Sequence, residues 1–210
     1  MIGIPILIGL LFLPAGTWAY REAWFYLLTL LIPMSLILVY FLKKDPALLI
    51  RRMKTGEKEP TQKLIVRLAL IPFLLAFILP GLDHRFGWSS VPDPVVVVAT
   101  VCILLGYLLF FLVLKENRFA SRVIEVVNEQ RVIQSGPYRL IRHPMYLGAI
   151  LIYVASPVAL GSNWALLPAV GIIPVLMARI VNEEQVLTRE LRGYQEYKEI
   201  TRYRLLPGIW

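Results

Sequence analysis

Long uncharged apolar runs divide the chain into segments that can cross a lipid bilayer. A spanning helix needs about 20 mainly apolar residues, and several runs approach this length between short polar segments. Residues 144–178 form 35 residues without a charged side chain, which as one helix would measure about 52 Å. Because the hydrocarbon layer is only about 30 Å thick, this run must fold back, and Gly161-Ser162-Asn163 is the predicted turn. The predicted spans are residues 23–42, 64–82, 94–114, 144–160 and 164–178.

The two ends of the chain complete the predicted fold. Residues 1–13 are apolar but would reach only about 20 Å as a helix, and they lack the basic start of a signal peptide. We interpret them as a short membrane-embedded helix. After residue 182, Leu187, Leu191 and Tyr194 recur at helical spacing and predict an amphipathic helix ending near Gly193. The fold class is therefore an all-α integral membrane protein: five transmembrane helices, a short N-terminal membrane helix, a hairpin of the last two spans, and a helical tail.

Composition and charge support this reading. Hydrophobic residues make up 58% and charged residues 17% of the 210 residues, whereas soluble domains have about 45–50% and 25%. This composition excludes a disordered chain and argues against a soluble globular one. When the spans alternate in direction, 20 of the 22 Lys and Arg residues fall on one side. That side is predicted to be cytoplasmic, with the C-terminus on it, and the net charge of +8 then needs no nucleic-acid partner.

Several kinds of chemistry have no signature in the sequence. The single cysteine, Cys102, excludes an intrachain disulfide and a cysteine-based zinc site. The two histidines, His84 and His143, fall on opposite sides, and no His/Asp/Glu cluster has metal-ligand spacing, so no metal is expected. No glycine-rich phosphate loop and no nucleophile motif is present.

Three polar clusters, residues 130–133, 135–146 and 179–184, flank the predicted hairpin. The hairpin returns the chain to the side that it left, so the second and third clusters should be neighbours in space. Pro144 suits the first turn of a helix, which would put Arg142 and His143 at its positive end. Free N–H groups and a guanidinium there could bind a carboxylate. The alternative is that the pair anchors the helix among lipid headgroups.

The third cluster contains two adjacent carboxylates. Arg179 and Glu183 are four residues apart and share one helix face, at a position where a partly buried charge usually faces a protein cavity. The alternative is an ordinary ion pair between them. Glu184 projects about 100° away from Glu183, so the two carboxylates should have different partners.

The order of these clusters resembles the isoprenylcysteine carboxyl methyltransferases, a family grouped with the phospholipid N-methyltransferases among membrane methyltransferases. The resemblance touches most of the chain and is strong from Gln130 onward. Its motifs are Ser135-Gly136-Pro137-Tyr138-Arg139-x-x-Arg142-His143-Pro144-Met145-Tyr146-x-Gly148, then Arg179-x-x-x-Glu183-Glu184, Tyr194-x-x-Tyr197 and Arg202-Tyr203-Arg204-Leu205-Leu206-Pro207.

The resemblance implies an enzyme that uses S-adenosylmethionine in a cytoplasmic pocket built around the hairpin and capped by the tail. It implies a single domain over residues 1–210, with N-terminal spans up to 114 and the cofactor-binding hairpin and tail from 115. Arg179 would face the acceptor's carboxylate, and Arg179 and Glu183 are the catalytic candidates. Since the family often has His where Gln130 stands, backbone contacts are expected there. The residues expected to bind the cofactor are Gln130, Arg131, Val132, Ile133, Tyr138, Arg142, His143, Pro144, Met145, Tyr146, Glu183 and Glu184.

The predicted reaction is methyl transfer to a lipid-like or prenylated acceptor that enters from the bilayer, with the carboxylate of an isoprenylcysteine-type compound as the leading candidate. The site has mainly to align donor and acceptor and exclude water. A protonated amine acceptor would also have to give a proton to Glu183 or His143. The alternatives are a phospholipid amine or thiol methyltransferase, an NADPH-dependent lipid or sterol reductase, which Glu183 and Glu184 disfavour by repelling a phosphate, and a membrane scaffold without activity.

Overall fold

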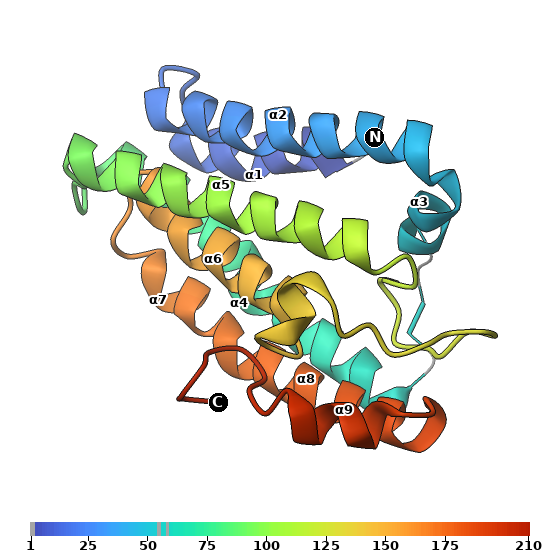
Figure 1. The fold of residues 1–210 in the computed structure, drawn as a ribbon. Helices are drawn as coiled ribbons and strands as arrows, with labels where there is room; N and C mark the ends of the chain where they lie inside the picture. Colours follow the sequence, from blue (N-terminus) through green and yellow to red (C-terminus); the bar gives the residue numbers. More distant parts are fainter. Residues whose placement is uncertain (1–2, 54–55, 58) are drawn as a thin grey trace.

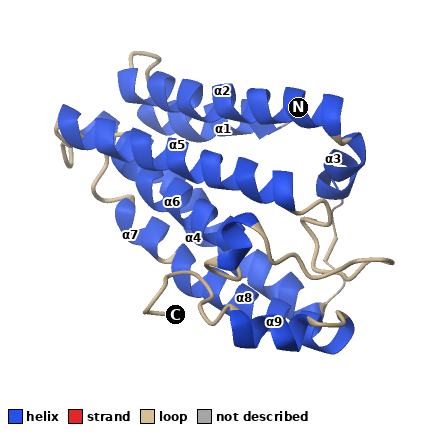
Figure 2. Ribbon diagram, in the orientation of Figure 1, coloured by secondary structure: helices blue, strands red, loops and turns tan. Residues whose placement is uncertain are grey.

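The computed structural model describes residues 3–53, 56–57 and 59–210, and every regular element in this part of the chain is a helix (Figures 1 and 2). The elements are α1 (Gly3–Ala15), α2 (Arg21–Lys44), α3 (Pro46–Met53), α4 (Pro60–Phe86), α5 (Asp93–Glu116), the 3-10 turn η1 (Gly136–Arg139), α6 (Pro144–Ala159), α7 (Leu166–Val170), α8 (Ile172–Glu190) and α9 (Tyr194–Ile200).

Four helical stretches are long and apolar enough to cross a membrane: α2, α4, α5 and the continuous stretch Leu166–Glu190 formed by α7 and α8. They contain four of the five predicted spans, and their outward faces carry apolar side chains such as Leu36 and Val98, as lipid-facing helices do. The predicted all-helical architecture is therefore confirmed for the described residues, and it is consistent with a membrane protein. Helix α6 has only 16 residues, about 24 Å, and α1 is also short, so the count of five spans stays a prediction.

Helices α5 and α6 lie side by side (Figure 1) because two glycines meet where they cross. A Cβ atom on Gly106 would lie 2.8 Å from the Gly148 carbonyl oxygen, and one on Gly148 would lie 3.0 Å from the Gly106 carbonyl oxygen. Small residues let helix backbones approach this closely. The contact places the start of α6, which carries the second polar cluster, beside the end of α5.

The turn predicted at residues 161–163 is present and is held by buried hydrogen bonds. Gly161 has a positive φ of 79°, which glycine adopts without strain. The Ser162 hydroxyl donates to Asp83, which also accepts from the backbone N–H and the hydroxyl of Ser89. The Tyr20 hydroxyl donates to the Leu160 carbonyl. The hairpin is thus joined to α4 and to the start of α2 at this end.

The tail follows the predicted amphipathic pattern with an earlier break. Helix α8 ends at Glu190, and Gly193, with a φ of 84°, starts the separate helix α9. Leu191, Tyr194 and Tyr197 form a buried cluster against Leu187, Tyr138 and Val132. The tail therefore packs onto the segment between α5 and α6 instead of extending into solvent.

Candidate active site

A cavity lies where the start of α6, the end of α8, the tail helix α9 and residues 117–133 meet. It encloses about 140 Å³. Eleven of the twelve residues expected to bind a cofactor line it, and Glu184 does not. The cavity is also lined by Arg179 and by residues that the sequence did not assign to the site, Asn117, Arg122 and Tyr194 among them.

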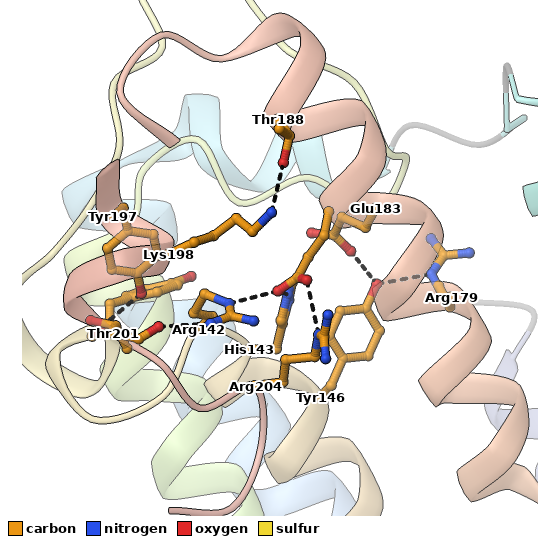
Figure 3. A network of polar contacts seen from close by, with 12 residues as sticks. Arg142, His143, Tyr146, Arg179, Glu183, Thr188, Tyr197, Lys198, Thr201 and Arg204 are labelled. Carbon is orange, nitrogen blue, oxygen red and sulfur yellow. Dashed lines mark hydrogen bonds and ion pairs between the residues drawn. The ribbon is translucent and has the colours of Figure 1, made fainter. Parts of the chain in front are cut away.

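Glu184, on α8, binds the start of α6 and the tail through Arg142, His143 and Arg204, the three partners labelled in Figure 3. Its Oε1 accepts a hydrogen bond from Arg142 Nε at 2.6 Å and lies 3.2 Å from His143 Nε2. Its Oε2 accepts from Arg204 Nε at 2.9 Å. The side chains of Arg142 and Glu184 are each only 5% exposed. Both oxygens are taken by protein groups, which differs from the cofactor contact expected for Glu184 and gives it a supporting position.

The beginning of α6 is not the open anion site that the sequence suggested. The backbone N–H groups of Arg142 and His143 donate to the carbonyls of Tyr203 and Arg204, both at 2.9 Å. Arg142 Nη1 donates to two more tail carbonyls, those of Thr201 at 2.8 Å and Arg202 at 2.7 Å. The tail carbonyls therefore occupy the donors that were expected to hold a carboxylate. Arg142 lines the cavity, but most of its hydrogen bonds hold the tail against α6.

Glu183 faces the cavity from the adjacent position on α8. It accepts a hydrogen bond from the Tyr146 hydroxyl at 2.5 Å, and Arg179 Nε donates to the same hydroxyl at 3.0 Å (Figure 3). Arg179 Nη2 donates to Glu57 at 2.6 Å and to the Arg122 carbonyl at 3.0 Å. A tyrosine hydroxyl thus joins Arg179 and Glu183, in place of the direct ion pair considered as an alternative. Glu183 and Glu184 have different partners, as their 100° separation predicts.

Four tyrosines line the cavity: Tyr138, Tyr146, Tyr194 and Tyr197. Tyr138 accepts a hydrogen bond from the Asn117 side chain at 3.0 Å, and burial raises its pKa to about 12. Tyr146 packs edge-on against the His143 ring at 5.7 Å between centroids. The Tyr194 hydroxyl is buried without a hydrogen-bond partner among the described residues. Burial, followed by the nearby Glu184 and Glu183, raises the pKa of Tyr194, so all of its donor capacity is available to a bound molecule.

The remaining expected residues also line the cavity. Gln130 Oε1 accepts from the Val127 backbone N–H at 3.0 Å, so the side chain of Gln130 stabilises a local turn. The expected backbone contacts of Gln130 with a cofactor stay a prediction. Met145 receives a hydrogen bond on its sulfur from Arg52 Nη1 at 3.2 Å, and burial, followed by the nearby Arg122, lowers the pKa of Arg52. Among the residues that the structure describes, no group of three His, Cys, Asp or Glu side chains could hold a metal ion.

Sequence reasoning missed Glu57, Arg122 and Tyr194. Glu57 and Arg122 reach Arg179 from segments distant in the chain, by 122 and 57 residues, and no local pattern marks them. Tyr194 did carry a signal, because it belongs to the tail motif, but its spacing was interpreted only as a packing position.

Comparison with known proteins bears on the segment that contributes most of this site. The family model described as phospholipid methyltransferase matches residues 94–193, which run from α5 through the hairpin to the end of α8. No curated protein matches the chain. Methyltransferases of this family generally use S-adenosylmethionine. Over residues 94–193 the chain is similar to the phospholipid methyltransferase family, which includes the isoprenylcysteine carboxyl methyltransferases, so the resemblance seen in the sequence motifs fits at this level. Four apolar helices of spanning length are consistent with an integral membrane protein.

Proposed function

We propose that the chain, as a single domain over residues 1–210, transfers a methyl group from S-adenosylmethionine to a lipid-like acceptor, with an isoprenylcysteine-type carboxylate as the leading acceptor. The observation that carries this proposal is the cavity itself. One space is lined by the residues that begin the hairpin and by Arg179 and Glu183 at its end. In this proposal the excess of basic residues puts the cavity and the tail on the cytoplasmic side.

The residues of the cavity suit the chemical groups of this cofactor. Glu183 can accept hydrogen bonds from ribose hydroxyls or an ammonium group, and Tyr138 and Tyr146 offer flat surfaces to an adenine ring. The unpartnered hydroxyl of Tyr194 needs a polar ligand atom, because a buried unsatisfied donor is costly. When bound, the sulfonium of the cofactor supplies an electrophilic methyl group.

The size of the cavity implies a movement on binding. About 140 Å³ is less than the roughly 300–1,000 Å³ of typical small-molecule sites. The wall formed by residues 117–133 has almost no regular structure, so we expect this segment to move outward when a nucleoside enters. Loop rearrangements of this kind accompany binding in many proteins.

The contacts of Tyr146 suggest how this chain aligns the two reactants. Its hydroxyl is hydrogen-bonded to both Glu183 and Arg179. A movement of Arg179 on acceptor binding would therefore also move the Tyr146 hydroxyl and Glu183 on the cofactor side. In this proposal Arg179 binds an acidic group of the acceptor, and the buried surroundings exclude water. A carboxylate acceptor needs no base, whereas an ammonium acceptor would give its proton to Glu183 or His143.

A second, apolar cavity supports a lipid-like acceptor. It measures about 490 Å³ and is lined by side chains of α1, α2, α4, α5 and α6. On α5, Phe110 and Leu114 line this cavity while Asn117 lines the cofactor cavity. These residues are three or four positions apart and share one helix face. The two cavities therefore follow each other along α5, as the head and the hydrocarbon chain of one amphiphile would require.

A specific contact also favours a second class of acceptor. Arg179 is already paired with Glu57, and the two side chains are only 13% and 10% exposed. An anionic acceptor would have to displace Glu57 from Arg179, whereas a phospholipid amine would meet a carboxylate beside the reaction centre. Amine methylation is therefore the second candidate function.

The experiment that tests the proposal is a labelled-methyl assay on the purified protein in lipid. The acceptor arms are an S-farnesylcysteine carboxylate and a phosphatidylethanolamine, and mass spectrometry identifies the labelled product. Arg179→Ala should raise KM for the acceptor and leave cofactor affinity within about twofold, and exposed Arg189→Ala is the matched control. Loss of cofactor affinity alone in Arg179→Ala would remove its acceptor role, and no labelled lipid in either arm would refute the proposal.

A further inference from the structure

The apolar cavity between the membrane helices carries hydroxyl groups that packing does not explain. Three tyrosines line it, together with phenylalanine and aliphatic side chains. Tyr26 is 2% exposed and its hydroxyl is hydrogen-bonded to the Ser156 hydroxyl at 2.8 Å. Ser156 in turn donates to the Ile152 carbonyl at 2.6 Å. Tyr26 therefore belongs to a satisfied network within the protein.

Tyr107 and Tyr153 differ from Tyr26. In the described part of the chain, no hydrogen bond joins either hydroxyl to another group. Neither hydroxyl is one of the fully buried side-chain atoms that lack a partner. Both residues are half-buried and line the cavity, so their free hydroxyls are accessible to a ligand in it. Leaving a hydroxyl without a partner in an apolar environment is unfavourable. Phenylalanine would fill the same space, as Phe73, Phe77 and Phe110 do in this cavity.

The position of the two residues argues against the usual role of tyrosine in membrane proteins. Tyrosines that anchor a helix lie at the membrane–water interface. Tyr107 lies nine residues before the end of α5 at Glu116, about 14 Å into the helix. Tyr153 lies in the interior of α6. Both therefore lie away from the helix ends, at positions where bulk water cannot satisfy their hydroxyls.

We propose that Tyr107 and Tyr153 form a hydrogen-bonding subsite for an ester carbonyl oxygen of an acyl lipid that is the methyl acceptor. Tyr153 lies seven residues beyond Tyr146 on α6, about 10 Å along the helix axis. The carbonyl would therefore lie about 10 Å from the methylated group. This inference rests on the proposed methyl transfer and favours its second candidate acceptor, an acyl phospholipid, over the isoprenylcysteine, because a prenyl chain has no oxygen at that depth.

The subsite can be tested by binding, independently of methyl transfer. The probes are two phosphoethanolamine lipids of equal chain length, one with ester-linked acyl chains and one with ether-linked alkyl chains that lack carbonyls. Their affinities for the purified full-length protein are measured by native mass spectrometry without cofactor. Two hydroxyl–carbonyl hydrogen bonds should give the ester lipid a preference of about fivefold or more.

The matched variants are Tyr107→Phe, Tyr153→Phe and the double variant, with Tyr40→Phe as the control, because Tyr40 packs against Phe41 and Phe111 outside this cavity. The double variant should bind the ester lipid several-fold more weakly, leave the ether lipid unchanged and abolish the preference. Equal binding of the two lipids to the wild-type protein, or no binding of either, overturns the subsite and needs no variant. If the preference is present but no lipid is methylated, the subsite stands and the proposed reaction fails.

Discussion

Removing the carboxylate of Glu184 should destabilise the protein far more than removing that of its neighbour Glu183. Glu184→Ala would leave Arg142, whose side chain is 5% exposed, without its counter-ion. Breaking a buried ion pair by removing one partner costs about 3–5 kcal/mol. Arg142 keeps its bonds to the carbonyls of Thr201 and Arg202, so the lower half of this range is expected. For a chain of this size 1 kcal/mol shifts Tm by about 2–4 °C, which predicts a loss of about 6–16 °C.

Glu183→Ala removes one hydrogen bond, from the Tyr146 hydroxyl, at a position that lines the cavity. Water can replace the carboxylate there, so the expected cost is below about 1.5 kcal/mol, or at most about 6 °C. The order of the two variants should be reversed for cofactor affinity, which should fall more in Glu183→Ala than in Glu184→Ala.

Both quantities can be measured on the same detergent-solubilised protein, with thermal unfolding followed by intrinsic fluorescence and cofactor affinity by calorimetry. Glu190→Ala is the matched control, because Glu190 pairs only with exposed Arg189 among the described residues and should change Tm by about 2 °C or less. Equal losses of Tm for the two neighbouring substitutions, or a larger loss for Glu183→Ala, would refute the supporting role assigned to Glu184.

Three further changes test other parts of the structure. Gly148→Val forces a side chain against the Gly106 carbonyl and should lower the free energy of unfolding by about 1–3 kcal/mol, measured by thermal unfolding. Gly3→Ala is the neutral control, because a Cβ there meets nothing within 4 Å. An unchanged stability of Gly148→Val would contradict the close helix contact. Burial raises the pKa of Tyr138 to about 12 from its ordinary 10, so the free energy of unfolding should fall as pH rises from 10 to 12. Tyr138→Phe should make this fall shallower by about 1.4 kcal/mol per pH unit. The same pH dependence in the variant, measured by denaturant titration, would argue against a buried phenol. Asp83→Ala removes the acceptor of three hydrogen bonds at the hairpin turn and should cost about 3 kcal/mol or more, and a Tm within 2 °C of wild type would show that the turn holds without it.

The membrane architecture could be predicted because its signal is local. Run length and the scarcity of charge, with Arg67 as the one charged residue in the predicted span 64–82, mark α2, α4 and α5 directly. The excess length of residues 144–178 required a reversal at 161–163. That reversal alone predicted that the segments containing His143 and Glu184 lie close together, and the 3.2 Å contact between His143 Nε2 and Glu184 Oε1 agrees with this.

The partners of the site residues could not be predicted in the same way. The sequence places Arg142 at a helix start, where free donors are expected, but it does not reveal that the carbonyls of Tyr203 and Arg204 return to occupy those donors. Glu57 likewise reaches Arg179 from 122 residues away. Pairings between distant segments depend on how loops pass over the bundle, and helical periodicity carries no information about that path.

The return of the tail to α6 has a consequence for biosynthesis. Arg142 receives part of its support from Arg202, 60 residues later in the chain. A ribosome has therefore delivered every membrane helix before the last support for His143 emerges. Until then the nearly complete polypeptide lacks the tail contacts beside the cavity, so a product truncated before Arg202 should not bind S-adenosylmethionine even when all its membrane helices are inserted.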